Sequence, residues 1–332
     1  MIIRSRAPVR ITFGGGGTDI PSYDKEHTGL CLGATIDKYV YSSLIPRESS
    51  KIEINSWDLD SKQTFDSLKD INYNGDGDLI KAVIKKMNPQ FGFDLYVRSD
   101  VQPHSGLGAS ASAAVSVIGL FNHLRTRDRL TKHQISELAY IIEQQEIKNI
   151  SGRQDQYASA FGGINLYEFH GDDFVLINPL DIKKDYILEL KKNLLMAYVG
   201  KKVQPSGEVH KKEKNINIER LHEIKKVAGE MEYALRKGRL NDFGLLIKDS
   251  WDKKVAYNPN ITTSHIDELV ETALKNGAIG ARLMGAGTGG HLLVYCKSNK
   301  EQIVAQKLEE KGAKIIPFSF DFTGLQTWEV ND

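Results

Sequence analysis

The sequence predicts an α+β protein with two domains. Its first third consists mostly of short β-branched and aromatic runs separated by turn residues, which predict strands. A long alanine-rich helix follows, and the second half of the chain then begins a new series of strands and helices. The length of 332 residues also favours two domains, because a single hydrophobic core usually stops growing at about 250 to 300 residues.

Strands and then helices are predicted along the first half. The predicted strands are Ile2–Arg6, Val9–Phe13, Cys31–Asp37, Tyr39–Ile45, Lys51–Asn55 and Phe91–Val97. Asn74–Gly77 marks a loop before a predicted helix at Leu79–Met87. Leu107–Leu124 carries apolar residues at helical spacing and also between those positions, which predicts a nearly buried helix. Further helices are predicted at Lys132–Lys148 and Asp155–Phe161.

The second half is predicted to repeat the mixture of strands and helices. A buried strand at Leu194–Val199 precedes an amphipathic helix at Ile218–Arg236. The remaining elements are the strands Ile279–Leu283 and His291–Cys296 around a glycine loop, the helix Glu301–Lys311 and the strand Lys314–Phe318. The polar run Asn178–Lys192 is the predicted boundary, which divides the chain into domains 1–185 and 186–332.

Composition excludes several function classes. Lysine and arginine total 44 and aspartate and glutamate 43, and this near-balance argues against a general nucleic-acid-binding protein. Cys31 and Cys296 cannot form a disulfide framework, so we expect two buried thiols in a reducing compartment. The N-terminus has no apolar core and no stretch approaches about 18 apolar residues, which predicts a cytoplasmic protein with no membrane partner.

Glycines gather in three clusters, and the middle one predicts a phosphate-binding loop. Pro103–Ala113 reads PHSGLGASASA and lies directly before the long helix. Glycines let backbone N–H groups approach an anion, and a helix N-terminus adds unsatisfied N–H groups and a positive dipole end. Ser105, Ser110 and Ser112 add hydroxyls that can bind phosphate or a metal. The alternative is a tight turn without a ligand. The pattern is neither a Walker A loop nor a dinucleotide-binding GxGxxG.

The other two clusters predict further walls of one pocket. In Ala7–Asp19 a strand ends in four glycines followed by Thr18 and Asp19, with Arg10 upstream. A planar cation and a strong acceptor suit a polyhydroxylated or phosphorylated ligand. Leu283–His291 reads LMGAGTGGH between two predicted strands. A flexible turn with an ordinary salt bridge and a glycine-rich hairpin are the alternatives for these two segments.

In this order, the three clusters resemble the motifs of the GHMP kinase superfamily, named for galactokinase, homoserine kinase, mevalonate kinase and phosphomevalonate kinase. Ala7–Arg10 matches the first motif, and Gly285–Gly290 matches the third, with Thr288 where glycine is common. The second motif is matched by Pro103, Gly106, Leu107, Gly108 and Ser110, with Ser112 replacing the usual alanine. The resemblance implies a two-domain fold with a ferredoxin-like C-terminal domain, and ATP and a sugar bound in the interdomain cleft.

Within this superfamily, three segments resemble the D-glycero-D-manno-heptose 7-phosphate kinases. They are Arg10–Asp19, Gly152–Gly163 and the C-terminal FSFDFTGLQTW. The resemblance implies ATP-dependent phosphorylation of the anomeric hydroxyl of the heptose phosphate. The 1,7-bisphosphate product would serve nucleotide-activated heptose and surface polysaccharide synthesis. The alternatives are a fucokinase-like or galactokinase-like sugar 1-kinase and a non-catalytic sugar sensor.

The resemblance also implies roles for individual residues. Asp155 would accept the sugar hydroxyl proton and Arg10 would lie near the transferred phosphoryl group, so both are predicted to be catalytic. Ser110 and Glu146 would ligate Mg²⁺, which takes few protein oxygens. The predicted ATP-binding and phosphate-binding residues are Pro103, Ser105, Gly106, Leu107, Gly108, Ala109 and Ser110. The predicted substrate-binding residues are Arg10, Gly16, Gly17, Thr18, Asp19, Asp155, Gly285, Gly287 and Thr288.

Two of these assignments have structural alternatives. Asp155 could cap a helix, and Glu146 could be a solvated carboxylate that Glu143, one turn away, replaces. The segment Gly200–Ser206 departs from the sugar-kinase pattern because it lacks an arginine. Lys201, Lys202 and Arg153 are the candidates for holding a sugar phosphate, because the resemblance places them near the substrate segments of the family. The exact sugar, its 7-phosphate, the oligomeric state and the polysaccharide pathway stay open at this point.

Overall fold

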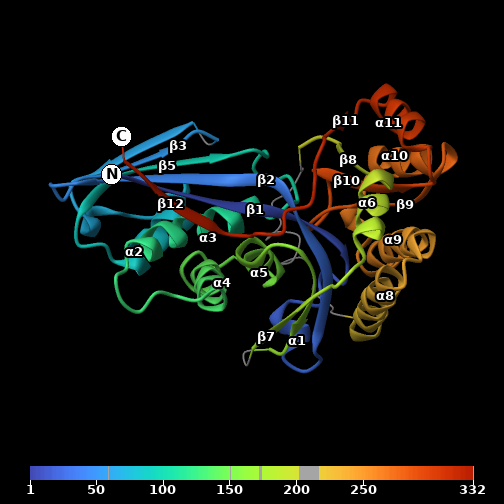
Figure 1. Cartoon of the computed structure of the whole chain (residues 1–332), viewed down its shortest axis with the longest axis horizontal. Coiled ribbons are helices and arrows are strands. Elements are labelled where there is room, and N and C mark those ends of the chain that lie inside the picture. The colour runs from blue at the N-terminus through green and yellow to red at the C-terminus, as the bar shows by residue number, and fades with distance from the viewer. Residues whose placement is uncertain (59, 150, 172–173, 202–216, 332) are drawn as a thin grey trace.

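The computed structural model describes residues 1–58, 60–149, 151–171, 174–201 and 217–331, and these residues form two β-sheets with their helices (Figure 1). The first sheet has eight strands in the order β12-β1-β2-β5-β3-β4, with β6 paired to β2 and β7 to β6. Their bounds are β1 Ile2–Gly14, β2 Gly29–Arg47, β3 Ile52–Ser56, β4 Ser61–Phe65, β5 Gly92–Ser99, β6 Ile164–Phe169, β7 Val175–Pro179 and β12 Gln326–Val330. All its pairings are antiparallel except that of β3 with β5.

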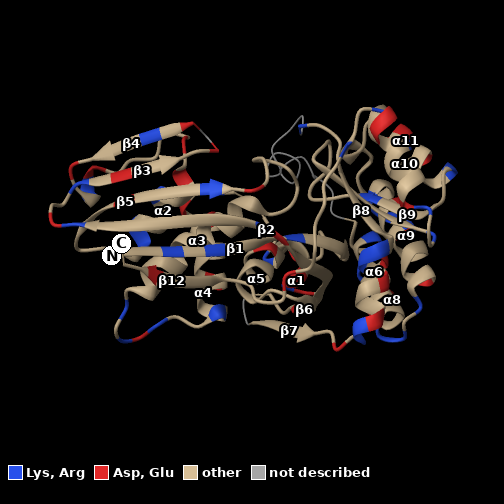
Figure 2. Ribbon diagram, turned by 45° about the horizontal axis from the view of Figure 1, so that its top comes forward, with Lys and Arg blue, Asp and Glu red and all other residues tan. Residues whose placement is uncertain are grey.

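Helices lie along one face of the long strands (Figures 1 and 2). They are α2 Asp78–Met87, α3 Ala109–His123, α4 Lys132–Ile141 and α5 Gln154–Phe161, while the short helices α1 Pro21–Asp24 and η1 Leu68–Asp70 lie in connections. The predicted burial of the long helix is confirmed, because α3 packs against Val40, Leu44 and Leu95 of the sheet through residues such as Val115 and Ile118. Helix α4 begins with a capping box at Thr131 and continues into a single π-helical turn, η2 Ile142–Glu146.

The second sheet has four antiparallel strands in the order β11-β8-β10-β9. The strands are β8 Leu194–Tyr198, β9 Ala278–Leu283, β10 His291–Cys296 and β11 Lys314–Ile315. The helices are α6 Lys184–Asn193, α8 Ile218–Arg236, α9 Leu240–Tyr257, η3 Pro259–Ile261, α10 Ser264–Lys275 and α11 Glu301–Glu310. The succession of strand, helices, two strands, helix and strand is that of a ferredoxin-like unit. The predicted α+β class is confirmed.

One apolar cluster joins the two halves. Val9, Ile11 and Phe13 of β1 share a buried cluster with Met231 of α8 and Phe243 of α9. The rings of Phe13 and Phe243 meet edge to face, with their centroids 5.1 Å apart. Strand β1 therefore fixes the position of the second half relative to the sheet that carries the first two glycine clusters.

The structure differs from the sequence prediction in the bounds of the first strands, at the predicted domain boundary and at the last strand. The predicted strand pairs 2–6 and 9–13, and 31–37 and 39–45, are the single long strands β1 and β2. The run 178–192 contains the end of β7 and most of α6. The last strand, β12, returns to the first sheet and pairs with β1. The division into 1–185 and 186–332 stays a prediction.

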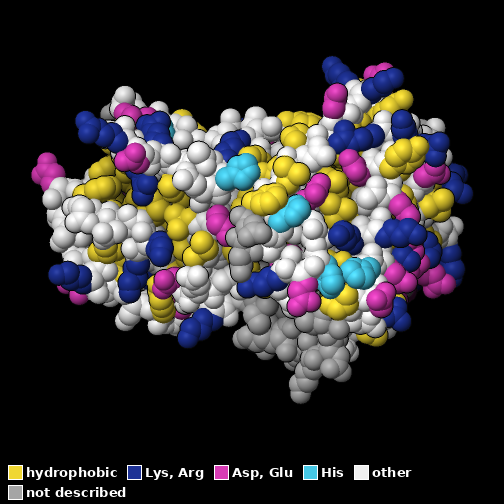
Figure 3. Space-filling view, turned by 90° about the horizontal axis from the view of Figure 1, so that it is seen from below, with side chains coloured by type: hydrophobic (Ala, Val, Ile, Leu, Met, Phe, Trp, Pro, Cys, Tyr) yellow, Lys and Arg dark blue, Asp and Glu magenta, His cyan; other side chains and the backbone are white. Residues whose placement is uncertain are grey.

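Charged side chains of both signs are interspersed over the surface that Figure 3 shows, in agreement with the near-zero net charge. Among the described residues, no helix is both long enough and apolar enough to span a bilayer.

Candidate active site

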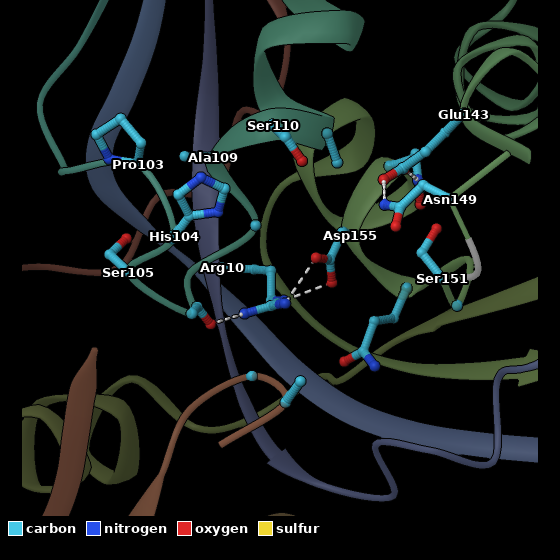
Figure 4. A pocket seen from close by; sticks show the side chains of 18 of the residues that line it. Arg10, Pro103, His104, Ser105, Ala109, Ser110, Glu143, Asn149, Ser151 and Asp155 are labelled. Carbon is cyan, nitrogen blue, oxygen red and sulfur yellow. Dashed lines mark hydrogen bonds and ion pairs between the residues drawn. The ribbon is translucent and has the colours of Figure 1, made fainter. Parts of the chain in front are cut away.

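A cavity of about 630 Å³ is lined by residues from both halves of the chain. Strand β1 and the glycine loop after it form one wall, and the loop before α3 forms another. The segment around α5 completes the first half of the lining, and Lys254, Arg282 and Gly285 contribute from the second half. Figure 4 shows this space with Asp155 near its centre and Ser110 and Glu143 at its edge. Its size and concave shape are typical of a small-molecule site.

The loop 103–108 has the geometry expected of a phosphate cradle. Gly106 and Gly108 have φ values of 83° and 78°, in the left-handed region that favours glycine. Gly108 is the N-cap of α3, so the first N–H groups of that helix begin at the cavity, where Ala109 and Ser110 lie. A Cβ on Gly106 would lie 2.6 Å from the carbonyl oxygen of Met284. The loop is therefore packed closely against the third glycine cluster.

The two other serines of this segment differ in surroundings. Ser105 lines the cavity, and its buried Oγ has no hydrogen-bond partner among the described residues. Ser112 is fully buried away from the cavity, where its Oγ donates to the carbonyl of Pro8 at 3.0 Å and lies 2.7 Å from Oγ of Ser159. Ser112 thus ties α3 to β1 and α5. Leu107 does not line the cavity, because its side chain is in the core.

Arg10 and Asp155 form a partly buried bidentate ion pair beside this loop (Figure 4). Nε of Arg10 donates to Oδ1 of Asp155 at 2.7 Å, and Nη2 donates to Oδ2 at 2.6 Å. Nη1 of Arg10 donates to the carbonyl of Gly106 at 2.5 Å, which connects the pair to the candidate phosphate-binding loop. Asp155 lies in the first turn of α5, but Arg153 is the N-cap, so the helix-capping alternative for Asp155 is wrong.

A second group of polar side chains lies at the glycine loop after β1. Asp19 accepts from the N–H of Gly17 at 3.1 Å and from Nε2 of Gln154 at 2.9 Å. Oγ1 of Thr12 donates to Oε1 of Gln154 at 2.7 Å. Thr12 and Gln154 were missed by the sequence reasoning. Alternation along a strand identifies Thr12, because residues 10 and 12 face the same side.

Thr18 holds the glycine loop from behind. Its buried Oγ1 donates to the carbonyl of Gly15 at 2.9 Å and accepts from the N–H of Leu30 at 2.9 Å. Gly16 and Gly17, in contrast, line the cavity. Of the predicted substrate-binding residues in this loop, the structure thus brings Gly16, Gly17 and Asp19 to the cavity and leaves Thr18 behind them.

Of the two candidate glutamates, Glu143 lines the cavity and Glu146 does not. The side chain of Glu146 is exposed and accepts a long hydrogen bond from Oη of Tyr73 at 3.5 Å. Glu143 is buried in the cavity wall, where it accepts from Nδ2 of Asn149 at 2.6 Å and from Nε2 of Gln156 at 2.7 Å. The π-helical turn η2 produces this difference, because its wider turn changes which side chain faces inward. The structure thus brings Glu143, the alternative considered from the sequence, to the cavity and leaves Glu146 outside its lining.

Burial, with a smaller contribution from the charge of nearby Asp155, raises the pKa of Glu143 from 4.5 to about 7, against the opposing effect of its hydrogen bonds. Among the described residues, no group of three or more His, Cys, Asp or Glu side chains could hold a metal ion. Mg²⁺ usually takes only one or two protein oxygens and keeps its other positions for water and phosphates. The Oγ of Ser110 and the carboxylate of Glu143, both at the cavity, fit that requirement.

The third glycine cluster packs against loop 103–108. Gly285 lines the cavity, and a Cβ on Gly290 would overlap the carbonyl of Ser105. Nδ1 of His291 donates to that same carbonyl at 2.9 Å. Gly287 and Thr288 do not line the cavity, because they pack on η3, where the N–H of Thr288 donates to the carbonyl of Ile261 at 2.7 Å.

The basic residues considered for a sugar phosphate lie away from the cavity or cannot be described. Arg153 is buried, donates to the carbonyl of Gly171 and lies 4.7 Å above the ring of Tyr140. Lys201 is exposed and does not line the cavity, and Lys202 lies outside the described residues. The cations that line the cavity together with Arg10 are Lys148, Lys254 and Arg282. Lys148, Lys254 and Arg282 lie outside the motifs recognised in the sequence, so nothing in the sequence indicated that they line the cavity.

Comparisons with known proteins agree with this geometry. A family model described as the GHMP kinases N terminal domain matches residues 78–163, and one described as GHMP kinases C terminal matches residues 231–314. A D-glycero-alpha-D-manno-heptose 7-phosphate kinase of Campylobacter jejuni is 31% identical over 99% of both chains. An L-fucokinase/L-fucose-1-P guanylyltransferase of Bacteroides fragilis is 24% identical over 94% of this chain and 36% of its own length.

Solved structures give the same picture. A D-glycero-D-manno-heptose 1-phosphate kinase from Bacteroides thetaiotaomicron superposes with a TM-score of 0.83 at 27% identity, covering 99% of this chain and 100% of that one. A putative sugar kinase from Campylobacter jejuni superposes with a TM-score of 0.80 at 29% identity, covering 99% and 98%.

Proposed function

Because the chain belongs to the GHMP kinases and is an ATP-dependent sugar kinase, we propose that it phosphorylates the anomeric hydroxyl of D-glycero-D-manno-heptose 7-phosphate. The product is the 1,7-bisphosphate. The observation that carries this proposal is the Arg10–Asp155 ion pair, which lies between a phosphate cradle and a glycine loop rich in hydrogen-bonding groups. The heptose 7-phosphate kinase that is 31% identical supports the choice of sugar.

The arrangement supports phosphoryl transfer by positioning and charge neutralisation. In the proposed reaction the phosphates of ATP lie on loop 103–108 and the N-terminus of α3. Oδ2 of Asp155 accepts the proton of the attacking hydroxyl, and the guanidinium of Arg10 neutralises charge on the transferred group. The hydrogen bond from Arg10 to the carbonyl of Gly106 keeps the cation at the boundary between donor and acceptor.

Magnesium fits the site through Ser110 and Glu143. Bound to the nucleotide, Mg²⁺ supplies charge neutralisation at the phosphates. Asn149 and Gln156 each donate to a different oxygen of Glu143, which fixes the plane of its carboxylate at the cavity. A fixed carboxylate is a more precise oxygen ligand than a mobile one.

The acceptor sugar lies, in this proposal, between Asp19 and Asp155. Gln154 bonds to both Thr12 and Asp19, and its neighbour is the proposed proton acceptor. A carboxylate that already holds two or more donors keeps further lone pairs for sugar hydroxyls. The Thr12–Gln154–Asp19 chain would orient the anomeric hydroxyl towards Asp155. We further propose that the enzyme acts in the cytoplasm and supplies nucleotide-activated heptose synthesis for surface polysaccharide.

The proposal is tested by ³¹P NMR of the product. The purified chain is incubated with ATP, Mg²⁺ and heptose 7-phosphate, and in parallel with heptose 1-phosphate, L-fucose and D-galactose. We expect a new phosphate signal at the anomeric carbon while the signal of the 7-phosphate remains. A higher kcat/KM for free fucose or galactose would replace the proposal with a fucokinase-like or galactokinase-like activity, in line with the similarity to the Bacteroides fragilis enzyme.

Two further outcomes would also overturn it. If the chain phosphorylates heptose 1-phosphate and not heptose 7-phosphate, its activity is the one named for the Bacteroides thetaiotaomicron structure. Binding of sugar phosphate without any turnover of ATP would indicate a sugar sensor.

A further inference from the structure

Arg282 is a buried cation that the proposed reaction does not use. It lies on β9, is 1% exposed and is the largest fully buried side chain among the described residues. It nevertheless lines the cavity together with Arg10, Thr12 and Asp19. A buried guanidinium at a ligand cavity calls for an explanation, because burying a charge costs free energy unless an opposite charge or hydrogen bonds compensate it.

The protein compensates this charge only in part. Nη1 of Arg282 donates to the carbonyl of Phe13 and to Oγ of Ser250, the latter at 2.8 Å. Nε is buried and has no partner, and Nη2 has no hydrogen bond to a described residue. None of the ion pairs between described residues includes Arg282. Both of its partners are neutral, so the described part of the chain supplies hydrogen bonds and no counter-charge.

The group is nevertheless charged at neutral pH. Burial, with a smaller contribution from the charge of Arg10, lowers the pKa of Arg282 from 12.5 to about 10. This direction is the one expected for a cation in an apolar wall without a carboxylate beside it. Binding of an anion would offset the cost of burying this charge.

The position of Arg282 identifies which ligand supplies that anion. Along β1, Arg10 bonds to the phosphate loop at Gly106, and Thr12 bonds to Gln154, which in turn bonds to Asp19. Arg282 bonds to the next residue, Phe13, so it lies beyond Thr12 in the direction of the glycine loop. It is therefore on the acceptor side of the Arg10–Asp155 pair, whereas the ATP cradle is on the other side.

We propose that Arg282 binds the phosphate ester that the acceptor sugar already carries, and so makes the site selective for phosphorylated sugars. The inference rests on the proposed function, since it assigns a contact to that acceptor. A guanidinium is well suited to the task because its planar fork gives two parallel hydrogen bonds to a phosphate. Arg282 takes the role that the sequence assigned to Lys201, Lys202 or Arg153.

The test compares Arg282→Met and Arg282→Lys with the wild-type chain. Methionine keeps an unbranched apolar stem, and lysine keeps the charge without the fork. We expect KM for heptose 7-phosphate to rise about 10- to 100-fold in Arg282→Met and less in Arg282→Lys, because a hydrogen bond to a charged group is lost. KM for ATP should change little. Ser250→Ala is the matched control, because it removes a neutral partner of Arg282 and keeps the cation.

Isothermal titration separates a phosphate contact from a structural role. Wild-type protein and each variant are titrated with heptose 7-phosphate and with unphosphorylated heptose. We expect the preference for the phosphorylated sugar to collapse in Arg282→Met and to persist in Ser250→Ala. An equal loss of affinity for both sugars, or a loss of affinity for ATP alone, would overturn the inference. Either result would leave heptose 7-phosphate as the substrate. Wild-type turnover of free sugars alone would instead refute the proposed function.

If Arg282→Met does not fold, Arg282→Lys decides the question. Its melting temperature is measured with and without heptose 7-phosphate and compared with that of the wild type. A ligand that binds only the folded state raises the melting temperature according to its affinity. A wild-type stabilisation that is retained in full by Arg282→Lys would contradict a bidentate phosphate contact.

Discussion

Substituting Gly108 with alanine perturbs the proposed proton acceptor through one added carbon atom. Gly108 caps α3 with φ 78°, and a Cβ built there lies 3.0 Å from Oδ2 and 3.1 Å from Cγ of Asp155. Such distances are tighter than nine in ten real Cβ contacts, so the carboxylate or the loop must shift by a few tenths of an ångström. The carboxylate is also held by two hydrogen bonds from Arg10, so it cannot move without weakening that pair.

Gly108→Ala is expected to lower both the free energy of unfolding and kcat, and the size of each effect can be estimated. The left-handed backbone costs alanine about 1 to 2 kcal/mol, which lowers the free energy of unfolding by that amount. A displacement of about 1 Å in a catalytic group can cost about 100-fold in rate, so a smaller shift of Asp155 predicts a fall in kcat of about 10-fold. KM for ATP should change little if the loop keeps its place.

Gly312→Ala is the matched control. Gly312 lies between α11 and β11 with φ 88°, and a Cβ there would have no neighbouring atom within 4 Å. The two variants carry the same backbone cost, so urea denaturation should give similar losses of stability. The coupled assay for ATP turnover with heptose 7-phosphate should show a reduced kcat only in Gly108→Ala. Equal kcat values in the two variants would refute the reasoning that Gly108 positions Asp155.

Three further outcomes are expected. Glu143→Gln raises the Mg²⁺ concentration for half-maximal rate by at least about 10-fold, and Glu146→Gln leaves it unchanged; a Mg²⁺ titration with the opposite pattern contradicts the assignment. Ser112→Ala lowers the free energy of unfolding in urea by about 1 to 3 kcal/mol; a raised KM for ATP would instead put this hydroxyl at the phosphates. Gly152→Ala, whose Cβ would overlap Asp19, raises KM for the sugar about 10-fold, and an unchanged KM argues against Asp19 as a sugar ligand.

The glycine clusters were the most informative part of the sequence. A position with positive φ that lies against another backbone favours glycine, so such positions can be recognised in the sequence as glycines. Gly106 and Gly290 are two examples, because a Cβ at either residue would meet the facing loop. The order of the clusters predicted that loops far apart in the chain line one cavity, and Arg10, Gly106 and Gly285 do so. Hydrophobic periodicity predicted most of the strands and the helices α2, α3, α4, α5, α8 and α11.

Glu143 shows what periodicity cannot resolve. Residues three apart on an α-helix face nearly the same side, so sequence spacing alone does not separate Glu143 from Glu146. The π-helical turn that separates them depends on tertiary contacts, including the hydrogen bonds of Glu143 to Asn149 and Gln156. No local pattern predicts such a turn.

Elements whose stability comes from distant partners were also missed. Helix α9 contains Gly244, which weakens a helical pattern in the sequence. A Cβ at this glycine would overlap the ring of Tyr295, so the residue serves close packing of the helix on its sheet. Strand β12 is short and mostly polar, and its pairing with β1 joins residues more than 300 positions apart. Arg282 belongs to the same class, because its burial and its place at the cavity depend on the whole fold.

The proposed reaction depends most directly on Asp155, and Asp155→Asn is its sharpest test. Asparagine has nearly the same shape and can still accept one hydrogen bond from Arg10, but it cannot take the proton of the sugar hydroxyl. The measurement pairs kcat with heptose 7-phosphate and the dissociation constant of ATP from titration. We expect kcat to fall about 100- to 10,000-fold while ATP affinity stays close to that of the wild type. A kcat close to that of the wild type would contradict the role of Asp155 as the proton acceptor.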